Sequence, residues 1–215
     1  KGISHSYMAK GNHIITTKIE HPAVLETCKE LEQEGFNITY LDVDNTGLIN
    51  LEELEKAITD KTILISVMYA NNEIGTIEPI KQIGAIAHSH GIFFHTDAVQ
   101  AAGIQNIDIK EMNIDSLSIS SHKFYGPKGI GALYMKKGIK FQRLIQGGHQ
   151  ERNKRAGTEN VAGIVGMAKA LELAHNNLSQ NITKIKELRD YYEIQIQKNI
   201  NNYKVNGNIE NRLPG

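Results

Sequence analysis

Short stretches rich in β-branched residues alternate along this chain with longer stretches whose apolar residues recur at helical spacing. Between the first two strand-like stretches, Val24, Leu25, Cys28 and Leu31 fall on one face of a helix that Gly35 ends. Strands that alternate with helices predict an α/β domain whose central sheet is mostly parallel. The expected strands are 12–19, 38–43, 62–68, 92–96, 116–120 and 130–135, and the expected helices are 21–34, 51–58, 79–90, 160–175 and 178–199.

Residue types at the expected boundaries support this assignment. Asn50 followed by Glu53 is a capping-box pattern before the helix 51–58. Pro79 suits the first turn of the next helix, and Gly91 suits its C-terminal end. The continuous apolar stretch 62–68 is typical of a strand that is buried on both faces.

Composition and charge exclude several classes of protein. The 215 residues carry 24 basic and 24 acidic side chains, so the chain lacks the excess positive charge of a nucleic-acid-binding protein. Its apolar runs fall far short of the roughly 20 residues that cross a bilayer, and we expect neither a membrane partner nor a secretory signal. A single cysteine, Cys28, excludes an internal disulfide and predicts a cytoplasmic location.

The two ends of the chain read as interrupted patterns. Residues 1–10 contain no residues typical of the start of a domain or of its first helix or strand. Residues 208–215 have the composition of a loop that leads into a further strand. The length fits one domain with part of a second. We therefore expect a fragment of a longer protein.

Polar residues follow three of the expected strands at their carboxyl ends, where ligands bind in open α/β sheets. Asp97 follows one strand, Lys123 follows another, and Asn71 and Asn72 follow a third. A lysine amine and a carboxylate at one edge suit pyridoxal phosphate, which needs a lysine for a Schiff base and an acid opposite its pyridine nitrogen.

Three neighbouring residues complete this pattern. Ser120 and His122 flank the turn before Lys123 and can donate hydrogen bonds to a phosphate. Gln100 lies about one helical turn beyond Asp97, within reach of the phenolic oxygen of the cofactor ring. The sequence therefore predicts a pyridoxal-phosphate site at the carboxyl edge of the sheet.

Each candidate also has an ordinary structural interpretation. Lysines in Gly-Pro loops such as that of Lys123 are usually solvated, Asp97 occupies a position typical of a helix N-cap, and His21 beside Pro22 is a common helix-start residue. Cys28, on an apolar helical face, is expected to pack in the core and not to act as a nucleophile.

Two further signals are weak. His88 and His90 lie near a helix end, but they lack the third ligand of a metal site, and no metal is expected. Gly147, Gly148 and Gly157 alone do not define a phosphate loop.

Five motifs together carry a resemblance to a known family. They are Glu20-His21-Pro22-Ala23-Val24, Ala70-Asn71-Asn72-Glu73-Ile74-Gly75, His95-Thr96-Asp97-Ala98-Val99-Gln100, Ser121-His122-Lys123-Phe124-Tyr125-Gly126-Pro127-Lys128-Gly129, and Gly147-Gly148-His149-Gln150-Glu151-Arg152 continuing to Arg155-Ala156-Gly157-Thr158-Glu159-Asn160. These motifs stand in the order and at the spacing found in the cysteine desulfurases of iron–sulphur cluster biosynthesis, and the sequence resembles that family over practically the whole chain. The residues of the last motif are most similar to those of the nitrogenase-associated type. These are class V, fold type I pyridoxal-phosphate enzymes.

The resemblance implies a three-layer α/β/α large domain over residues 1–178, followed over 179–215 by a linking helix and the start of a small C-terminal domain. It implies that Lys123 is the Schiff-base lysine, that Asp97 pairs the pyridine nitrogen and that Gln100 bonds the phenolic oxygen. It also implies that His21 stacks on the ring and serves as an acid–base group.

Further roles follow from the same resemblance. Ser120 and His122 would hold the phosphate, and Asn72 would lie near the substrate carboxylate and the ring oxygen. The family counterpart of Thr158 reaches the phosphate of the other subunit, which implies a homodimer. Three family features have no counterpart in this sequence: an Ala-Thr-Glu phosphate loop, a mobile-loop cysteine and a carboxylate-binding arginine.

The reaction implied is conversion of L-cysteine to L-alanine, with sulfane sulfur passed to an enzyme cysteine and on to an iron–sulphur scaffold or another acceptor protein. Lys123 would take the α-proton and His21 would move protons on the other face. The alternatives are another class V enzyme, such as a selenocysteine lyase or an aminotransferase, and an inert fragment or dimerisation module.

Overall fold

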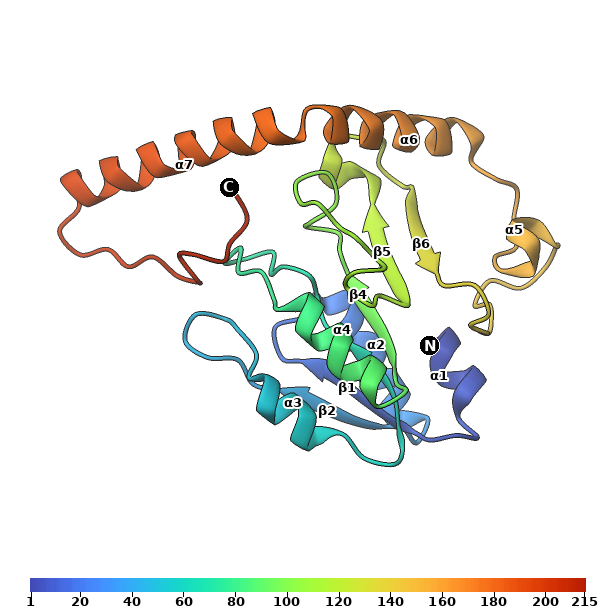
Figure 1. Cartoon of the computed structure of the whole chain (residues 1–215). Helices are drawn as coiled ribbons and strands as arrows, with labels where there is room; N and C mark the ends of the chain where they lie inside the picture. The colour runs from blue at the N-terminus through green and yellow to red at the C-terminus, as the bar shows by residue number, and fades with distance from the viewer.

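The centre of the molecule is a six-stranded sheet in the order β2-β1-β3-β4-β5-β6. A computed structural model describes all residues 1–215 (Figure 1). The first five strands run parallel and β6 pairs antiparallel with β5, so the mostly parallel sheet predicted from the sequence is confirmed. The strands are β1 (His13–Thr17), β2 (Asn37–Leu41), β3 (Thr62–Ser66), β4 (Phe93–Asp97), β5 (Ser116–Ser120) and β6 (Gly131–Met135).

All five expected helices are present, with ends within about two residues of the predicted ones. They are α2 (Pro22–Gln33), α3 (Leu51–Ala57), α4 (Ile80–Ser89), α6 (Val161–Asn176) and α7 (Leu178–Asn199). Three short elements were not predicted: α1 (Gly2–Tyr7), the 3₁₀ helix η1 (Ser121–Phe124) and α5 (Gln150–Asn153). Each spans fewer than two helical turns, which is too short for a helical period to show in the sequence. None of the helices has the length and apolar character needed to cross a membrane.

Two hydrophobic cores cover opposite faces of the sheet because successive strand residues point to opposite sides. On one face, Ile15 and Phe94 pack in a cluster with Leu54 of α3 and Ile83 of α4. The second cluster contains Ile14 and Leu64 from the strands, together with Ile3 of α1 and Leu31 of α2. The α/β chain therefore has the three layers that were expected, and β3, in the middle of the sheet, is buried throughout.

The residues predicted to mark helix ends lie at or next to the ends of the observed helices, but the predicted capping box is incomplete. The Asn50 side chain accepts hydrogen bonds from the backbone N–H groups of Glu52 (2.8 Å) and Glu53 (3.3 Å), but Glu53 makes no return hydrogen bond. Gly91 adopts a left-handed φ of +66° just past α4, as a C-terminal stop requires. Pro79 lies at the N-cap of α4, one position before the first turn.

Helices α6 and α7 run almost end to end along one side of the molecule (Figure 1). After α7 the chain turns back, and its last residues return to the loop that follows β3. This return brings the C-terminal segment beside the edge of the sheet at which the candidate residues lie.

Gly84, in the middle of α4, permits a close approach that fixes this helix on the sheet. A Cβ atom there would lie 2.0 Å from the backbone oxygen of Met112. We expect Gly84→Ala to lower the free energy of unfolding by about 1–3 kcal/mol through overpacking, although alanine favours a helix over glycine by about 1 kcal/mol. Urea unfolding measures the effect, with the exposed Gln82→Ala on the same helix as the control. Equal or higher stability of Gly84→Ala would contradict this packing.

Candidate functional site

The carboxyl ends of four parallel strands meet at one edge of the sheet and place the candidate residues there. His21 follows β1, Asn72 follows β3, Asp97 ends β4, and Lys123 follows β5. Backbone hydrogen bonds hold the neighbouring strand ends together: Tyr69 N–H donates to the oxygen of Asp97 (2.8 Å), and Ala98 N–H donates to that of Ser118 (3.0 Å). The predicted grouping at one edge is therefore present.

Asp97 is half-buried and oriented by a local turn. Its Oδ1 accepts a hydrogen bond from the N–H of Val99 at 2.9 Å, while its second oxygen makes no hydrogen bond. Asp97 therefore caps a turn, residues 99–104, and not the helix N-terminus that its structural interpretation expected, and one carboxylate oxygen remains available. Gln100 lies in the same turn and is also half-buried.

Lys123 projects from η1 and is exposed, and its amine has neither a hydrogen bond nor an ion pair. Ser120 Oγ and His122 Nδ1 lie 2.9 Å apart on either side of the start of η1. Tyr125 ends the turn in a left-handed conformation, φ +66°, and a Cβ on Gly126 would lie 2.1 Å from Ser121 Oγ. The tight turn between β5 and β6 therefore presents the side chains of His122 and Lys123 outward.

His21 is the N-cap of α2 and is exposed. Its Nδ1 accepts a hydrogen bond from the N–H of Ala23 at 3.1 Å. In the neutral imidazole, Nε2 therefore carries the proton. The same bond that starts the helix fixes the ring and leaves Nε2–H free to act.

Two buried polar residues, Glu20 and Asn71, join the His21 turn to the loop that carries Asn72, and sequence reasoning gave Glu20 no role. Glu20 Oε1 accepts hydrogen bonds from Met68 N–H (2.8 Å) and from Thr17 Oγ1 (2.9 Å), and the Asn71 side-chain amide donates to the oxygen of Ile19 (2.9 Å). We call the Glu20–Met68 and Asn71–Ile19 hydrogen bonds the two-loop bridge. The only signal in the sequence was position, because Glu20 directly precedes His21 and Asn71 directly precedes Asn72.

Burial sets the charge state of two carboxyl groups at this edge. Burial raises the pKa of Glu20 to about 8, against the opposing effect of the Met68 and Thr17 hydrogen bonds, and the charge of Asp97 raises it further. Burial likewise raises the pKa of Glu78 to about 7. Glu78 Oε2 accepts from Ile49 N–H at 3.2 Å. Glu20 Oε2 and Glu78 Oε1 are buried without a hydrogen-bond partner.

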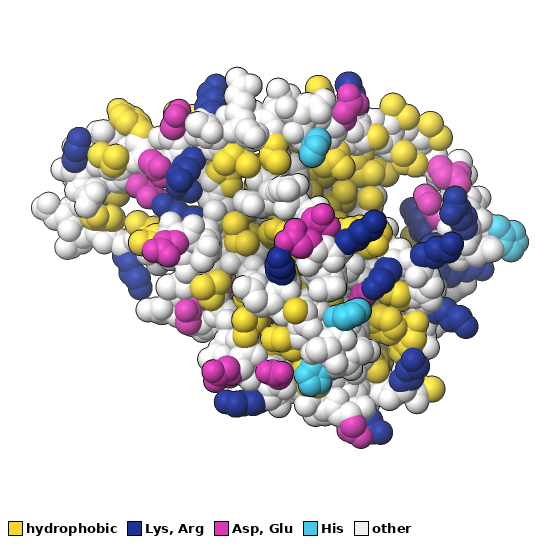
Figure 2. All heavy atoms as spheres, viewed as in Figure 1, with side chains coloured by type: hydrophobic (Ala, Val, Ile, Leu, Met, Phe, Trp, Pro, Cys, Tyr) yellow, Lys and Arg dark blue, Asp and Glu magenta, His cyan; other side chains and the backbone are white.

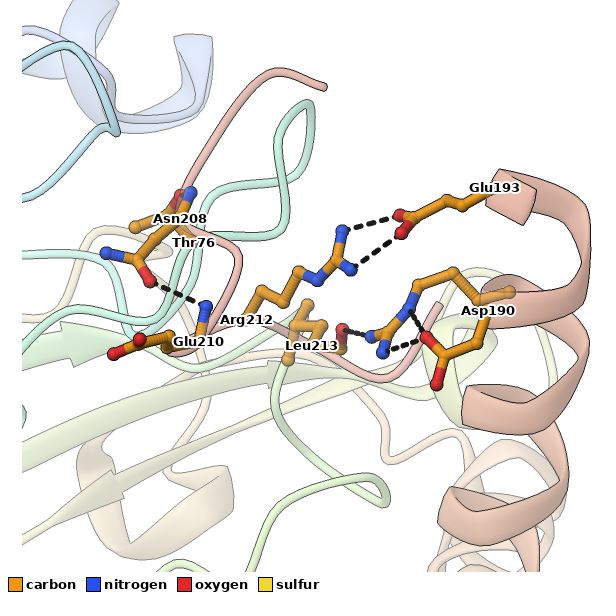
Figure 3. Close-up of polar contacts among 8 residues, drawn as sticks. Thr76, Asp190, Glu193, Asn208, Glu210, Arg212 and Leu213 are labelled. Atoms are coloured by element: carbon orange, nitrogen blue, oxygen red, sulfur yellow. Dashed lines mark hydrogen bonds and ion pairs between the residues drawn. The ribbon is translucent and has the colours of Figure 1, made fainter. Parts of the chain in front are cut away.

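The loop that carries Asn72 is a short hairpin, residues 70–77, and the C-terminal segment holds its outer side. Leu213 N–H donates to the oxygen of Gly75 (2.9 Å), and Asn208 N–H donates to Thr76 Oγ1 (2.9 Å). Figure 3 shows the Arg212 guanidinium of this segment facing the Glu193 carboxylate of α7, at 2.6 and 2.9 Å. Helix α7 is therefore connected to the hairpin.

Three other residues lie outside this group. Burial raises the pKa of the Cys28 thiol to about 11, and the side chain is buried in α2, so the expected packing role is confirmed. His95 lies half-buried between Ser66 Oγ (2.8 Å) and Ser118 Oγ (2.9 Å), and desolvation of its ring lowers its pKa to about 4. Thr158 is exposed between α5 and α6 and contacts none of the other candidates through a hydrogen bond.

A family model and the sequences of curated proteins point to the same family. The family model described as aminotransferase class-V matches residues 1–215. The chain is 58% identical over 216 residues to a cysteine desulfurase IscS of Clostridium botulinum and 55% identical over 214 residues to one of Dictyoglomus turgidum, covering 100% of this chain in both cases. It spans 54% of the length of these relatives.

Solved structures agree. A NifS-like protein superposes with a TM-score of 0.94 at 40% identity, over 99% of this chain and 58% of that one. SspA, solved in complex with cysteine, gives a TM-score of 0.78 at 46% identity, over 80% of this chain and 50% of that one.

The two buried carboxyl groups generate a prediction for stability. Because their folded-state pKa values lie above the ordinary value of 4.5, the folded protein binds more protons than the unfolded one between about pH 4.5 and pH 7–8. The contribution of these two carboxyl groups to the free energy of unfolding should therefore fall as the pH rises through this range, by at most about 1.4 kcal/mol per pH unit for each group. His95, whose pKa burial lowers to about 4 from 6.5, contributes in the opposite sense below about pH 6.5.

Urea unfolding at several pH values between 5 and 8 measures this slope. Glu78→Gln should remove the negative contribution of one carboxyl group from the slope of the free energy of unfolding against pH. Glu53→Gln, at an exposed position on α3, should leave the slope unchanged. A Glu78→Gln slope equal to that of the wild type would show that Glu78 is ionised in the folded protein.

Proposed function

Because this chain belongs to the aminotransferase class-V family, we propose that the protein is a pyridoxal-phosphate-dependent cysteine desulfurase that converts L-cysteine to L-alanine. One observation carries the proposal: Asp97 and Lys123 lie at the ends of neighbouring strands, each with a functional atom free of any other partner. The names of the relatives support the choice of reaction.

The chemistry of the donor set fits pyridoxal phosphate. Lys123 would bind the cofactor through its amine, the free oxygen of Asp97 would pair the pyridine nitrogen, and Gln100 would reach the phenolic oxygen. The adjacent Ser120 hydroxyl and His122 ring are the donors for the phosphate. When bound, the cofactor supplies an electron sink for the charge released at the substrate α-carbon.

Side chains of the protein itself would transfer the protons and bind the substrate. The Lys123 amine would take the α-proton of cysteine, and His21 Nε2 would move a proton on the opposite face, held in place by its bond to Ala23 N–H. Asn72, exposed on its hairpin, would orient the substrate carboxylate. Cys28 is unsuited to accept the sulfur because it is buried and protonated, so the accepting thiol is a different one.

We further propose that the protein acts as a cytoplasmic homodimer that passes sulfur to an iron–sulphur scaffold or another acceptor protein. Hydrophobic side chains lie exposed along α6 and α7 (Figure 2), among them Val161, Val165, Tyr191 and Tyr192. A surface of this kind is typical of an interface. Thr158, exposed just before α6, is the residue proposed to reach the phosphate of the other subunit.

The role of Lys123 is tested by labelling. Borohydride reduction of the full-length holoenzyme should fix the cofactor on the peptide that contains Lys123 and not on Lys128. Lys123→Ala should lower alanine formation from cysteine by at least 10²-fold, the lower end of what a general acid–base group contributes. The exposed Lys128→Ala is the control. Label on Lys128, or none, would refute the assignment, and product analysis with selenocysteine and with amino acceptors separates the other class V reactions.

The role of Asp97 is tested by a substitution that preserves its turn. Asparagine caps about as well as aspartate, so Asp97→Asn should change the free energy of unfolding by only about 0–1 kcal/mol. It should nevertheless lower kcat by at least 10²-fold, because a neutral amide no longer holds the pyridine nitrogen protonated. Unfolding curves and kcat for alanine formation are measured on the same preparation. Normal turnover would show that Asp97 only caps its turn.

A further inference from the structure

The two residues whose side chains form the two-loop bridge are immediate chain neighbours of candidate functional residues. Glu20 precedes His21 and Asn71 precedes Asn72. The bridge residues are 4% and 6% exposed, whereas His21 and Asn72 are exposed. The bridge therefore holds the backbone from which each functional side chain projects, and it sets the position of one loop against the other.

We propose that Glu20, in its protonated form, is a positioning residue that fixes His21 relative to Asn72 by joining the turn after β1 to the loop after β3. The proposal rests on the function proposed above for His21 and Asn72. It assigns Glu20 a part in the reaction without contact with substrate.

The surroundings of Glu20 favour the protonated form. Oε1 already accepts two hydrogen bonds, and Oε2 is buried without a partner. The titratable groups that act on Glu20 are Asp97 of β4, Glu78 beyond the hairpin and the thiol of Cys28 on α2, and none of them is a cation. A charge on Glu20 would thus be buried without a counter-charge, which is strongly unfavourable.

Ionisation of Glu20 has a structural consequence. The pKa of about 8 means that a substantial fraction of the protein loses this proton in mildly alkaline solution. The charge can be hydrated only if water reaches Oε2, and this requires the two loops to separate. We therefore expect the bridge to open above about pH 8, with loss of the relative placement of His21 and Asn72.

Two variants separate the positioning role from simple stability. Glu20→Gln keeps the Oε1 acceptor for Met68 N–H and replaces the O–H group by an amide that cannot ionise. Glu20→Ala removes the acceptor altogether. Glu78→Gln is the matched control, because Glu78 is also buried with one unpartnered oxygen, but its backbone hydrogen bond goes to Ile49 and not to the two-loop bridge.

Hydrogen exchange of the Met68 amide in the cofactor-free full-length protein tests the bridge without reference to activity. After correction for the intrinsic rate, exchange should rise at least tenfold between pH 7 and pH 9.5 in the wild type and in Glu78→Gln. It should stay within threefold of its pH 7 value in Glu20→Gln. The same rise in Glu20→Gln as in the wild type would overturn the proposal.

Steady-state kinetics of the full-length holoenzyme with L-cysteine tests the positioning role. At pH 7, Glu20→Gln should keep kcat within threefold, and folded Glu20→Ala should lose at least tenfold in kcat. The pH at which kcat falls in alkaline solution should move up by at least one unit in Glu20→Gln and should not move up in Glu78→Gln, because the Glu78 charge raises the pKa of Glu20.

Three outcomes of these experiments are decisive. The positioning role of Glu20 would be overturned if folded Glu20→Ala kept the wild-type kcat. It would also be overturned if kcat of Glu20→Gln fell at the same alkaline pH as that of the wild type. If the wild-type holoenzyme forms no alanine, the proposed function is wrong, and the exchange of the Met68 amide alone then decides whether protonated Glu20 holds the two loops together.

Discussion

Parallel pairing of the central strands is the constraint on which the rest of the molecule depends. Because β1, β3, β4 and β5 run in the same direction, their carboxyl ends meet at one edge, and the polar residues that follow them converge there. The two hydrophobic cores make this pairing stable by covering both faces of the sheet. Segments far apart in sequence thus contribute to a single site.

A shared edge does not by itself place side chains with the accuracy that catalysis requires. The loops at this edge leave the hydrogen-bond ladder, so their backbone groups need other partners. Two buried side chains provide some of them, since Glu20 accepts from the Met68 amide and Asn71 donates to the Ile19 carbonyl. Backbone groups of the C-terminal segment provide others on the outer side of the hairpin. Positioning of the loops is therefore a matter of buried polar contacts as much as of apolar packing.

The sequence predicted the features that local pattern controls. The bounds of β5 and α7 were predicted to the residue, because alternation and helical period persist over their full length. The antiparallel direction of β6 was not predicted, since it depends on which strand it pairs with in space. Candidate residues were found from their place after strands, but Glu20 was not, because its partner Met68 lies 48 residues away.

The structural and functional interpretations of the candidate residues are compatible at the atomic level. Asp97 uses one oxygen for the N–H of Val99 and keeps the other free, and His21 uses Nδ1 for the N–H of Ala23 and keeps Nε2 free. In each case the structural hydrogen bond removes the rotational freedom of the side chain and so directs the second polar atom. A capping residue at a strand end is thus well suited to a site that needs pre-oriented groups, and its capping role is no argument against function.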